Sequence, residues 1–213
     1  MKVRGILFDF DDTIVKSEDS RFESLKKVLR DENITFTRKE WDSEYRSLGS
    51  VPILDLLKKK YFKKYDSEEL YLHSKEIREI IEDKGVELVA GFKELIKELD
   101  RREIKYLICS GGRGDHVQDL LKQHNLEDID GFGREDYENR KPAPDAFLEG
   151  LKRLQLSPEE VIIFEDSYSG IQSGIATGCR VFGVNTNEHE QCSELAVEKI
   201  LKDFTEFDLS YLN

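Results

Sequence analysis

Apolar residues in this chain gather in short runs and in periodic stripes, which are typical of strands and helices in alternation. The first run covers residues 3–8 and stops at the polar segment 9–13, as a buried strand that ends in a loop would. Three more runs of this kind follow much later, at residues 104–109, 161–164 and 180–184. We therefore predict four buried strands, each followed by polar residues.

The segments between the later runs have the spacing of helices with one buried face. In residues 91–101, apolar side chains recur at the i, i+3, i+4 and i+7 positions, namely Phe92, Leu95, Ile96 and Leu99. Residues 116–126, 146–156 and 171–177 repeat this pattern. Strands that alternate with helices predict an α/β fold, with a three-layer, Rossmann-like core around a parallel sheet.

Residues 16–88 interrupt the alternation, because every apolar pattern there has the helical period. A capping box, Thr37 to Glu40, precedes a helical stripe that Gly49 is well placed to end, and Ser67 is a candidate N-cap. Further helices are expected at residues 22–29, 53–65 and 68–82. We predict an α/β core of residues 1–15 and 89–213, and an inserted helical cap of residues 16–88.

Composition narrows the class of protein. The 213 residues include 33 Lys and Arg against 45 Asp and Glu, a formal net charge of −12 that would repel nucleic acid or an anionic membrane. No stretch is apolar enough to span a bilayer, and no signal peptide is visible. The three cysteines have no metal-binding spacing. We expect a cytoplasmic protein with reduced cysteines, and a monomer by default.

Candidate catalytic and ligand-binding residues lie at or just after the carboxyl ends of predicted strands, at the edge where open parallel sheets gather ligands. Asp9 and Asp11 come after the first strand and point the same way in an extended segment. Paired carboxylates repel each other unless a cation or a proton lies between them. A hard divalent ion such as Mg²⁺ is the natural occupant of such a site.

Three further sites follow the later strands. Ser110 and Gly111 come directly after the second strand, where a hydroxyl and backbone N–H groups are able to approach an anion. Lys141 lies in a proline-rich turn and offers a point charge for a phosphoryl oxygen. Glu165 and Asp166 end the most apolar strand and would complete a metal site. Each signal alone is also typical of an ordinary loop, but their combination in this order is specific.

This constellation resembles the haloacid dehalogenase superfamily, with its motifs Asp-x-Asp-x-Thr, a strand-end Ser or Thr, a Lys and a terminal acidic pair. The resemblance spans nearly the whole chain, including the helical insertion. The segments Arg-Lys-Pro-Ala-Pro-Asp at 140–145 and Phe-Glu-Asp-Ser-Tyr-Ser-Gly at 164–170 look most like the β-phosphoglucomutase and phosphatase branch. The resemblance implies phosphoryl transfer to or from a small phosphorylated metabolite.

The resemblance also implies a role for each motif residue. Asp9 would be the nucleophile that forms an aspartyl-phosphate, and Asp11 would be the general acid and base. Ser110, Gly111 and Lys141 would hold the phosphoryl oxygens. Mg²⁺ would be bound by Asp9, the Asp11 carbonyl and Asp166, with Glu165 as a direct or indirect ligand, and Thr13 would support the first loop by hydrogen bonding.

Departures from the branch bear on the choice of reaction. Asp12 stands where a glycine is usual, and we interpret it as an exposed turn aspartate. Pro52 stands where the mutases carry a phosphate-binding arginine, so a Mg²⁺-dependent phosphatase is the preferred prediction. The alternatives are a β-phosphoglucomutase-like sugar-phosphate mutase, or a non-catalytic binding protein that kept the fold. The best candidates for contacts to the leaving group are Arg46, Gly49 and Arg140.

Overall fold

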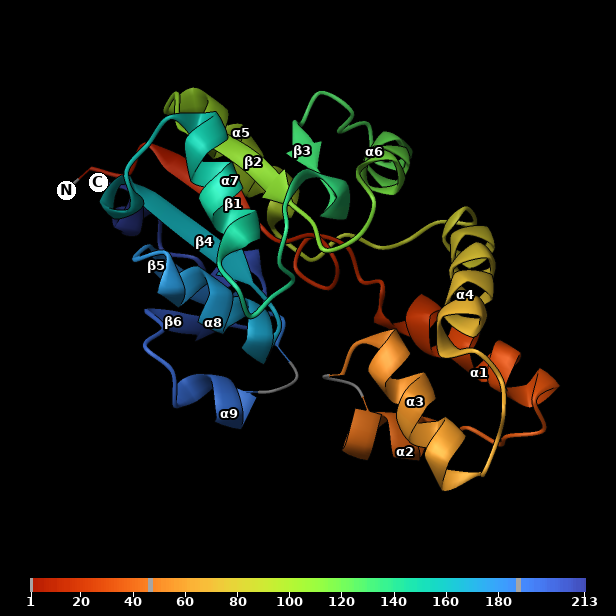
Figure 1. Cartoon of the computed structure of the whole chain (residues 1–213). Coiled ribbons are helices and arrows are strands. Elements are labelled where there is room, and N and C mark those ends of the chain that lie inside the picture. The colour runs from red at the N-terminus through yellow and green to blue at the C-terminus, as the bar shows by residue number, and fades with distance from the viewer. Residues whose placement is uncertain (1, 46–47, 187–188) are drawn as a thin grey trace. The chain divides into compact units, whose positions relative to one another are not determined.

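One parallel sheet of six strands, in the order β3-β2-β1-β4-β5-β6, organises the larger part of the chain (Figure 1). The computed structural model that shows this sheet describes residues 2–45, 48–186 and 189–213. Each strand pairs in parallel with its neighbours, which confirms the predicted α/β fold. The strands are β1 (Gly5–Phe8), β2 (Lys105–Cys109), β3 (Gly131–Phe132), β4 (Val161–Glu165), β5 (Arg180–Val184) and β6 (Lys199–Leu201).

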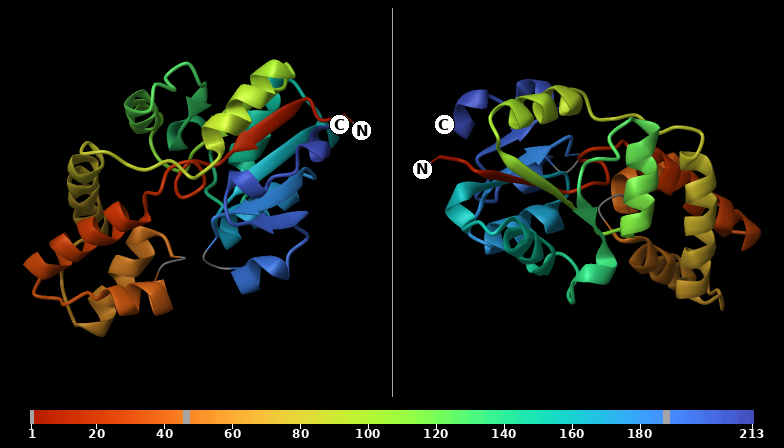
Figure 2. Two further views of the ribbon diagram at one scale, coloured as in Figure 1. Left: turned by 180° about the vertical axis from the view of Figure 1, so that it is seen from behind. Right: turned by 90° about the horizontal axis from the view of Figure 1, so that it is seen from above.

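Helices connect successive strands and cover both faces of the sheet (Figure 2). On one side lie α7 and α8, and on the other side lie α5 and the C-terminal segment. The helices of this layered unit are α5 (Phe92–Arg101), α6 (Gly114–Gln123), α7 (Asp145–Leu154), α8 (Tyr168–Ala176) and α9 (His189–Ser193). Short 3-10 turns are η2 (Arg134–Asp136), η3 (Pro158–Glu160), η4 (Phe204–Glu206) and η5 (Leu209–Leu212).

Successive residues of each central strand face opposite layers, and both layers are apolar. Leu7 is in register with Leu107 and Ile163, and these side chains join the buried cluster that contains residues of α7 and α8. On the opposite face, Phe8 stacks on Phe164 with ring centroids 5.4 Å apart, within an aromatic cluster that includes Phe92, Phe182, Phe204 and Phe207. Burial on both faces explains why these strands are nearly continuous apolar runs.

The chain divides into two compact units, of which the sheet unit comprises Met1–Lys16 and Glu87–Asn213. The second unit, Ser17–Val86, is helical in the residues described. Its buried core is formed by aromatic and aliphatic side chains around Trp41, including Phe22, Leu25 and Leu54. The elements are α1 (Glu18–Asp31), α2 (Arg38–Glu40), the π-helical turn η1 (Trp41–Tyr45), α3 (Ser50–Lys60) and α4 (Ser67–Glu82).

Local details of the helical unit differ from the sequence-based expectations. The Thr37 capping box is present, but regular α-helix gives way to a π-helical turn at Trp41. Gly49 is the N-cap of α3 and does not end the preceding helix. Asp66, with a side chain that accepts two backbone N–H groups, caps α4 in place of Ser67. Only at α4 does a neighbouring residue, Asp66, supply the boundary signal that was assigned to another position.

Two strands, β3 and β6, were not predicted from the sequence. With two and three residues, they are too short to show apolar alternation. The three cysteines are buried, and no disulfide joins them in the described chain. Within the same residues, the helices are too short or too polar for any of them to traverse a bilayer.

Candidate active site

The candidate residues lie at the switch point of the sheet, where successive strands are added on opposite sides of β1. From β1 the chain adds β2 and β3 on one side, and β4, β5 and β6 on the other. Asp9 directly follows β1, and Glu165 ends the adjacent strand β4. Such a switch point, at the carboxyl ends of the strands, is the usual ligand site of an open parallel sheet.

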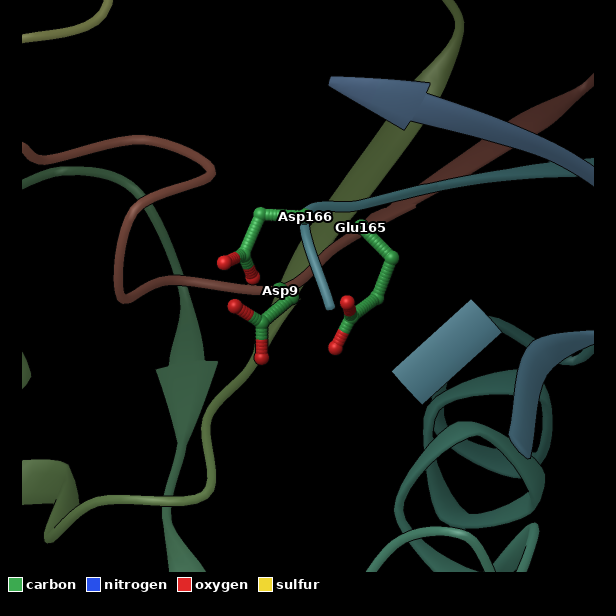
Figure 3. Close-up of side chains that lie close together, drawn as sticks. All are labelled: Asp9, Glu165 and Asp166. Carbon is green, nitrogen blue, oxygen red and sulfur yellow. The ribbon is translucent and has the colours of Figure 1, made fainter. Parts of the chain in front are cut away.

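Three carboxylates, from Asp9, Glu165 and Asp166, face one another at this point (Figure 3). Each contributes an oxygen that lies within 4.8 Å of the others. Asp9 is only 6% exposed and Glu165 only 1%. Because like charges repel strongly away from water, a cluster of this kind is suited to a divalent cation with oxygen ligands.

Lys141 supplies positive charge to this cluster. Its Nζ donates to Asp9 Oδ1 at 2.5 Å and to Glu165 Oε1 at 2.7 Å. The ammonium also lies 4.7 Å from the centre of the Phe147 ring, a favourable cation–π position. One cation beside three carboxylates leaves an excess of negative charge, which a bound Mg²⁺ would balance.

Glu165 is fixed by donors on both of its oxygens. While Oε1 accepts from Lys141, Oε2 accepts from the Ser167 backbone N–H at 2.6 Å and from the Ser167 hydroxyl at 3.0 Å. Ser167 is itself the N-cap of α8 and accepts from the Gly170 N–H. A Cβ on Gly170 would lie 1.6 Å from Glu165 Oε1, so only glycine leaves room for this carboxylate.

Burial and charge shift the proton affinities of the cluster. Burial, assisted by the negative charge of Glu165, raises the pKa of Asp9 to about 7, although Lys141 opposes the shift. Burial and the same Glu165 charge also raise the pKa of Asp166. For Lys141, burial would lower the pKa, but the ion pairs with Asp9 and Glu165 raise it. The lysine therefore stays charged.

Asp11 and Ser110 lie close together beside this cluster. Ser110 is fully buried, and its Oγ accepts from the Gly112 N–H at 2.9 Å. A Cβ added to Gly112 would lie 3.3 Å from Ser110 Oγ and 3.7 Å from Asp11 Oδ2, which places the Asp11 carboxylate next to this loop. Gly111 is exposed, and a Cβ there would meet nothing within 4 Å. The loop after β2 thus contains the buried Ser110 hydroxyl and the exposed Gly111, and the Asp11 carboxylate lies next to it.

Supporting contacts hold the loop that follows β1. The Thr13 hydroxyl donates to Asp166 Oδ1 at 3.5 Å, a long contact that is compatible with a supporting role for Thr13. Asn185, at the end of β5, donates from Nδ2 to the Asp12 carbonyl at 2.8 Å. Asp12 has a φ of 59°, a conformation that favours glycine. This backbone geometry gives a physical reason for the glycine that is usual at this position in the family that the sequence resembles.

Some residues of the site were missed from the sequence. Ser167 follows the acidic pair at a helix start and was recognisable as an N-cap, whereas Asn185 gave no signal in the sequence. Gly49 belongs to the helical unit, and Arg140 is exposed. Arg46 lies outside the described residues.

Comparison with known proteins identifies the family of this chain. The haloacid dehalogenase-like hydrolase family model matches residues 6–184. A Thermotoga maritima protein named phosphorylated carbohydrates phosphatase is 27% identical over 198 residues, which cover 85% of each chain. Hexitol phosphatase A of Escherichia coli K12 is 32% identical over 108 residues, and this alignment spans only 50% of each chain. The crystal structure of β-phosphoglucomutase from Clostridium difficile has a TM-score of 0.82 at 18% identity, covering 99% of this chain and 95% of that one.

Proposed function

The chain belongs to the haloacid dehalogenase-like hydrolases, in the branch of the phosphatases and β-phosphoglucomutases, and from this premise we propose that it is a Mg²⁺-dependent phosphatase with an aspartyl-phosphate intermediate. The observation that carries the proposal is the carboxylate trio Asp9, Glu165 and Asp166, of which Asp9 and Glu165 are buried, with Lys141 bonded to these two. A nucleophile, a place for a divalent cation and a fixed positive charge meet there at the end of β1.

Asp9 and Asp166 are the proposed direct side-chain ligands of Mg²⁺, together with the Asp11 carbonyl. Glu165 has protein donors on both oxygens, so we assign it to holding Lys141 and the start of α8. The donor set is hard oxygen with excess negative charge, which fits Mg²⁺. When bound, the ion would screen the nucleophilic carboxylate from an anionic phosphoryl group.

The protein residues then divide the transfer into two displacements. The Asp9 carboxylate forms a bond to phosphorus while the bond to the leaving oxygen breaks, and Asp11 gives that oxygen a proton. In the second half, Asp11 takes a proton from water, whose oxygen attacks phosphorus and releases the Asp9 carboxylate and inorganic phosphate. Ser110, the Gly111 N–H and Lys141 hold the phosphoryl oxygens in both steps.

The proposed substrates are small phosphorylated metabolites, with phosphorylated carbohydrates as the first class to test. Two relatives carry names that refer to such compounds, a phosphorylated carbohydrates phosphatase and a hexitol phosphatase. The inserted segment, residues 16–88, is the proposed cap of this branch, and it would select the leaving group.

Phosphate release from a panel of phosphomonoesters tests the proposal. The panel includes hexose and hexitol phosphates, phosphoglycolate and nucleotides, each with Mg²⁺ and with a chelator. We expect Mg²⁺-dependent release that falls by about a thousandfold or more in Asp9→Asn, because the nucleophile is lost. Asp119→Asn is the matched control, since Asp119 is exposed on α6 and pairs only with Lys122 among the described contacts.

Two outcomes would contradict the phosphatase proposal. If β-glucose 1-phosphate were isomerised with little free phosphate, the protein would be a mutase. If no ester reacted and none isomerised, a non-catalytic binding role would take its place.

A further inference from the structure

Segment 133–137, which follows β3, is bonded at three points to the loop that follows β2. The Tyr137 hydroxyl donates to the Ser110 carbonyl at 3.1 Å. The Arg134 backbone N–H donates to the Gly112 carbonyl at 2.7 Å, and Glu135 Oε1 accepts from the Gly114 N–H at 2.8 Å. Of these three bonds, only the one from Tyr137 acts on the peptide that joins Ser110 to Gly111.

That bond determines which way the Gly111 N–H points. In a trans peptide, the carbonyl and the N–H of one plane point in opposite directions. Because the Ser110 carbonyl is directed to Tyr137, the Gly111 N–H is turned to the other side of the loop. Among the described residues, no hydrogen-bond acceptor is recorded for this N–H. It is therefore available to an external anion.

Contacts with Arg134, Phe132 and the core cluster fix the position of the Tyr137 ring. The Arg134 guanidinium lies 4.9 Å from the centre of the Tyr137 ring and also donates to the Tyr137 and Glu138 carbonyls. The ring meets Phe132 edge to face at 6.3 Å and packs against the main core cluster. A Cβ on Gly133 would come within 2.2 Å of the Gly114 nitrogen, so the two loops are in close backbone contact. The phenol is thus a preorganised donor.

We propose that Tyr137 is a positioning residue, whose hydroxyl keeps the Ser110–Gly111 peptide turned so that the Gly111 N–H binds the phosphoryl group. This inference rests on the proposed phosphatase function, since it concerns the same site. Without the hydroxyl, the peptide is free to rotate and the N–H is presented to the anion for a smaller part of the time. The loss would weaken binding of phosphate in any ester, whatever the leaving group.

The test compares Tyr137→Phe with wild type by titration with inorganic phosphate in the presence of Mg²⁺, followed by the ¹⁵N and ¹H shifts of backbone amides. We expect the dissociation constant for phosphate to rise about fivefold, as the loss of one hydrogen bond implies. The free variant should also show a shifted Gly111 amide signal. With an active ester substrate, KM should rise by a similar factor and kcat should change less.

Tyr106→Phe is the matched control, because the Tyr106 hydroxyl also makes one hydrogen bond, to Asp100, on strand β2 of the same unit. A purely structural role for Tyr137 would lower Tm and leave the phosphate dissociation constant unchanged. An unchanged constant and an unshifted Gly111 signal in Tyr137→Phe would overturn the inference, as would a wild-type protein that binds no phosphate. Phosphate binding is measured without turnover, so a wild type that binds phosphate but hydrolyses no ester would refute the proposed function and not this inference.

Discussion

Asp9 occupies a position in which an ionised carboxylate is costly. It is buried next to Glu165 and Asp166, and its ion pair with Lys141 offsets only part of that cost. The result is the raised pKa of about 7. Because burial makes the ionised form of Asp9 costly, the contribution of this residue to folding should depend on pH.

The first prediction concerns stability in the absence of metal. The pKa of Asp9 is raised from 3.8 to about 7, so the folded state favours the protonated form. The stability that this group contributes is complete below pH 3.8 and is lost as the pH rises through about 7. In chelator, we expect Asp9→Asn to melt about 5 °C above wild type near pH 8, with a much smaller difference near pH 5. Thermal unfolding across this range measures the effect, and a difference that is independent of pH would contradict it.

The second prediction concerns Gly170, the glycine that leaves room for the Glu165 carboxylate. In Gly170→Ala, the new Cβ would displace the Glu165 carboxylate and so disturb its bond to Lys141. We expect kcat/KM to fall about a hundredfold, since a displacement of about 1 Å in such a site has effects of that size. Overpacking should also cost about 1–3 kcal/mol in the free energy of unfolding.

Ser169→Ala is the control for this glycine, because it changes the adjacent residue of the same helix turn without entering the Glu165 pocket. Steady-state kinetics and denaturant unfolding of both variants are compared with wild type. Wild-type activity in Gly170→Ala would show that the position of Glu165 does not matter for the reaction.

At the scale of elements, side-chain caps mark the starts of α2 and α4 in the second unit. The Asp66 carboxylate accepts from the backbone N–H groups of Glu68 and Glu69 at 2.9 and 3.0 Å. These bonds lower the pKa of Asp66, so the charged form is present at neutral pH and also favours the positive end of the helix dipole. The start of α4 therefore depends on one exposed side chain.

The third prediction follows from this cap. Asp66→Ala should lower the urea concentration at which the helical unit unfolds, whereas Asp66→Asn, which keeps an acceptor oxygen, should lower it less. Trp41 is the single tryptophan of the chain and is buried in the core of this unit, so its fluorescence during urea unfolding reports the change. Equal losses in the two variants would show that charge, and not capping, stabilises the helix start.

At the scale of the whole molecule, the chain leaves and re-enters the sheet unit at neighbouring points. Val15 forms a β-bridge with Leu88, and the Lys16 N–H donates to the Glu87 carbonyl at 2.8 Å. These bonds lie within the sheet unit. An insertion with adjacent ends adds a folding unit without breaking the strand order of its host.

The fourth prediction tests this arrangement. Replacing residues 17–86 by a short Gly-Ser linker should leave a protein that retains its sheet and unfolds cooperatively, because the linker has only to join Lys16 to Glu87. Far-UV circular dichroism and thermal unfolding measure the outcome. A truncated chain without a cooperative transition would show that the sheet unit depends on the helical one for its stability.

The sequence by itself determined the class of fold and the identity of the candidate residues. Apolar periodicity and capping signals act over a few neighbouring positions, so the long strands and the helices between them were predictable. The short strands β3 and β6 were not, because two or three residues carry no period. Helix boundaries in the insertion shifted where adjacent residues, such as Asp66 and Ser67, offer competing caps.

Only the tertiary structure decided how the candidate residues contact one another. Lys141 bonds to both Asp9 and Glu165, residues that lie 132 and 24 positions away along the chain. The Ser167 contacts occupy the second Glu165 oxygen, and Tyr137 reaches the Ser110 carbonyl from another loop. Such contacts depend on the order of the strands and on the paths of loops between them, which no local pattern of residues encodes. The sequence therefore showed which residues were candidates for the site, whereas the fold determined which of them are in contact.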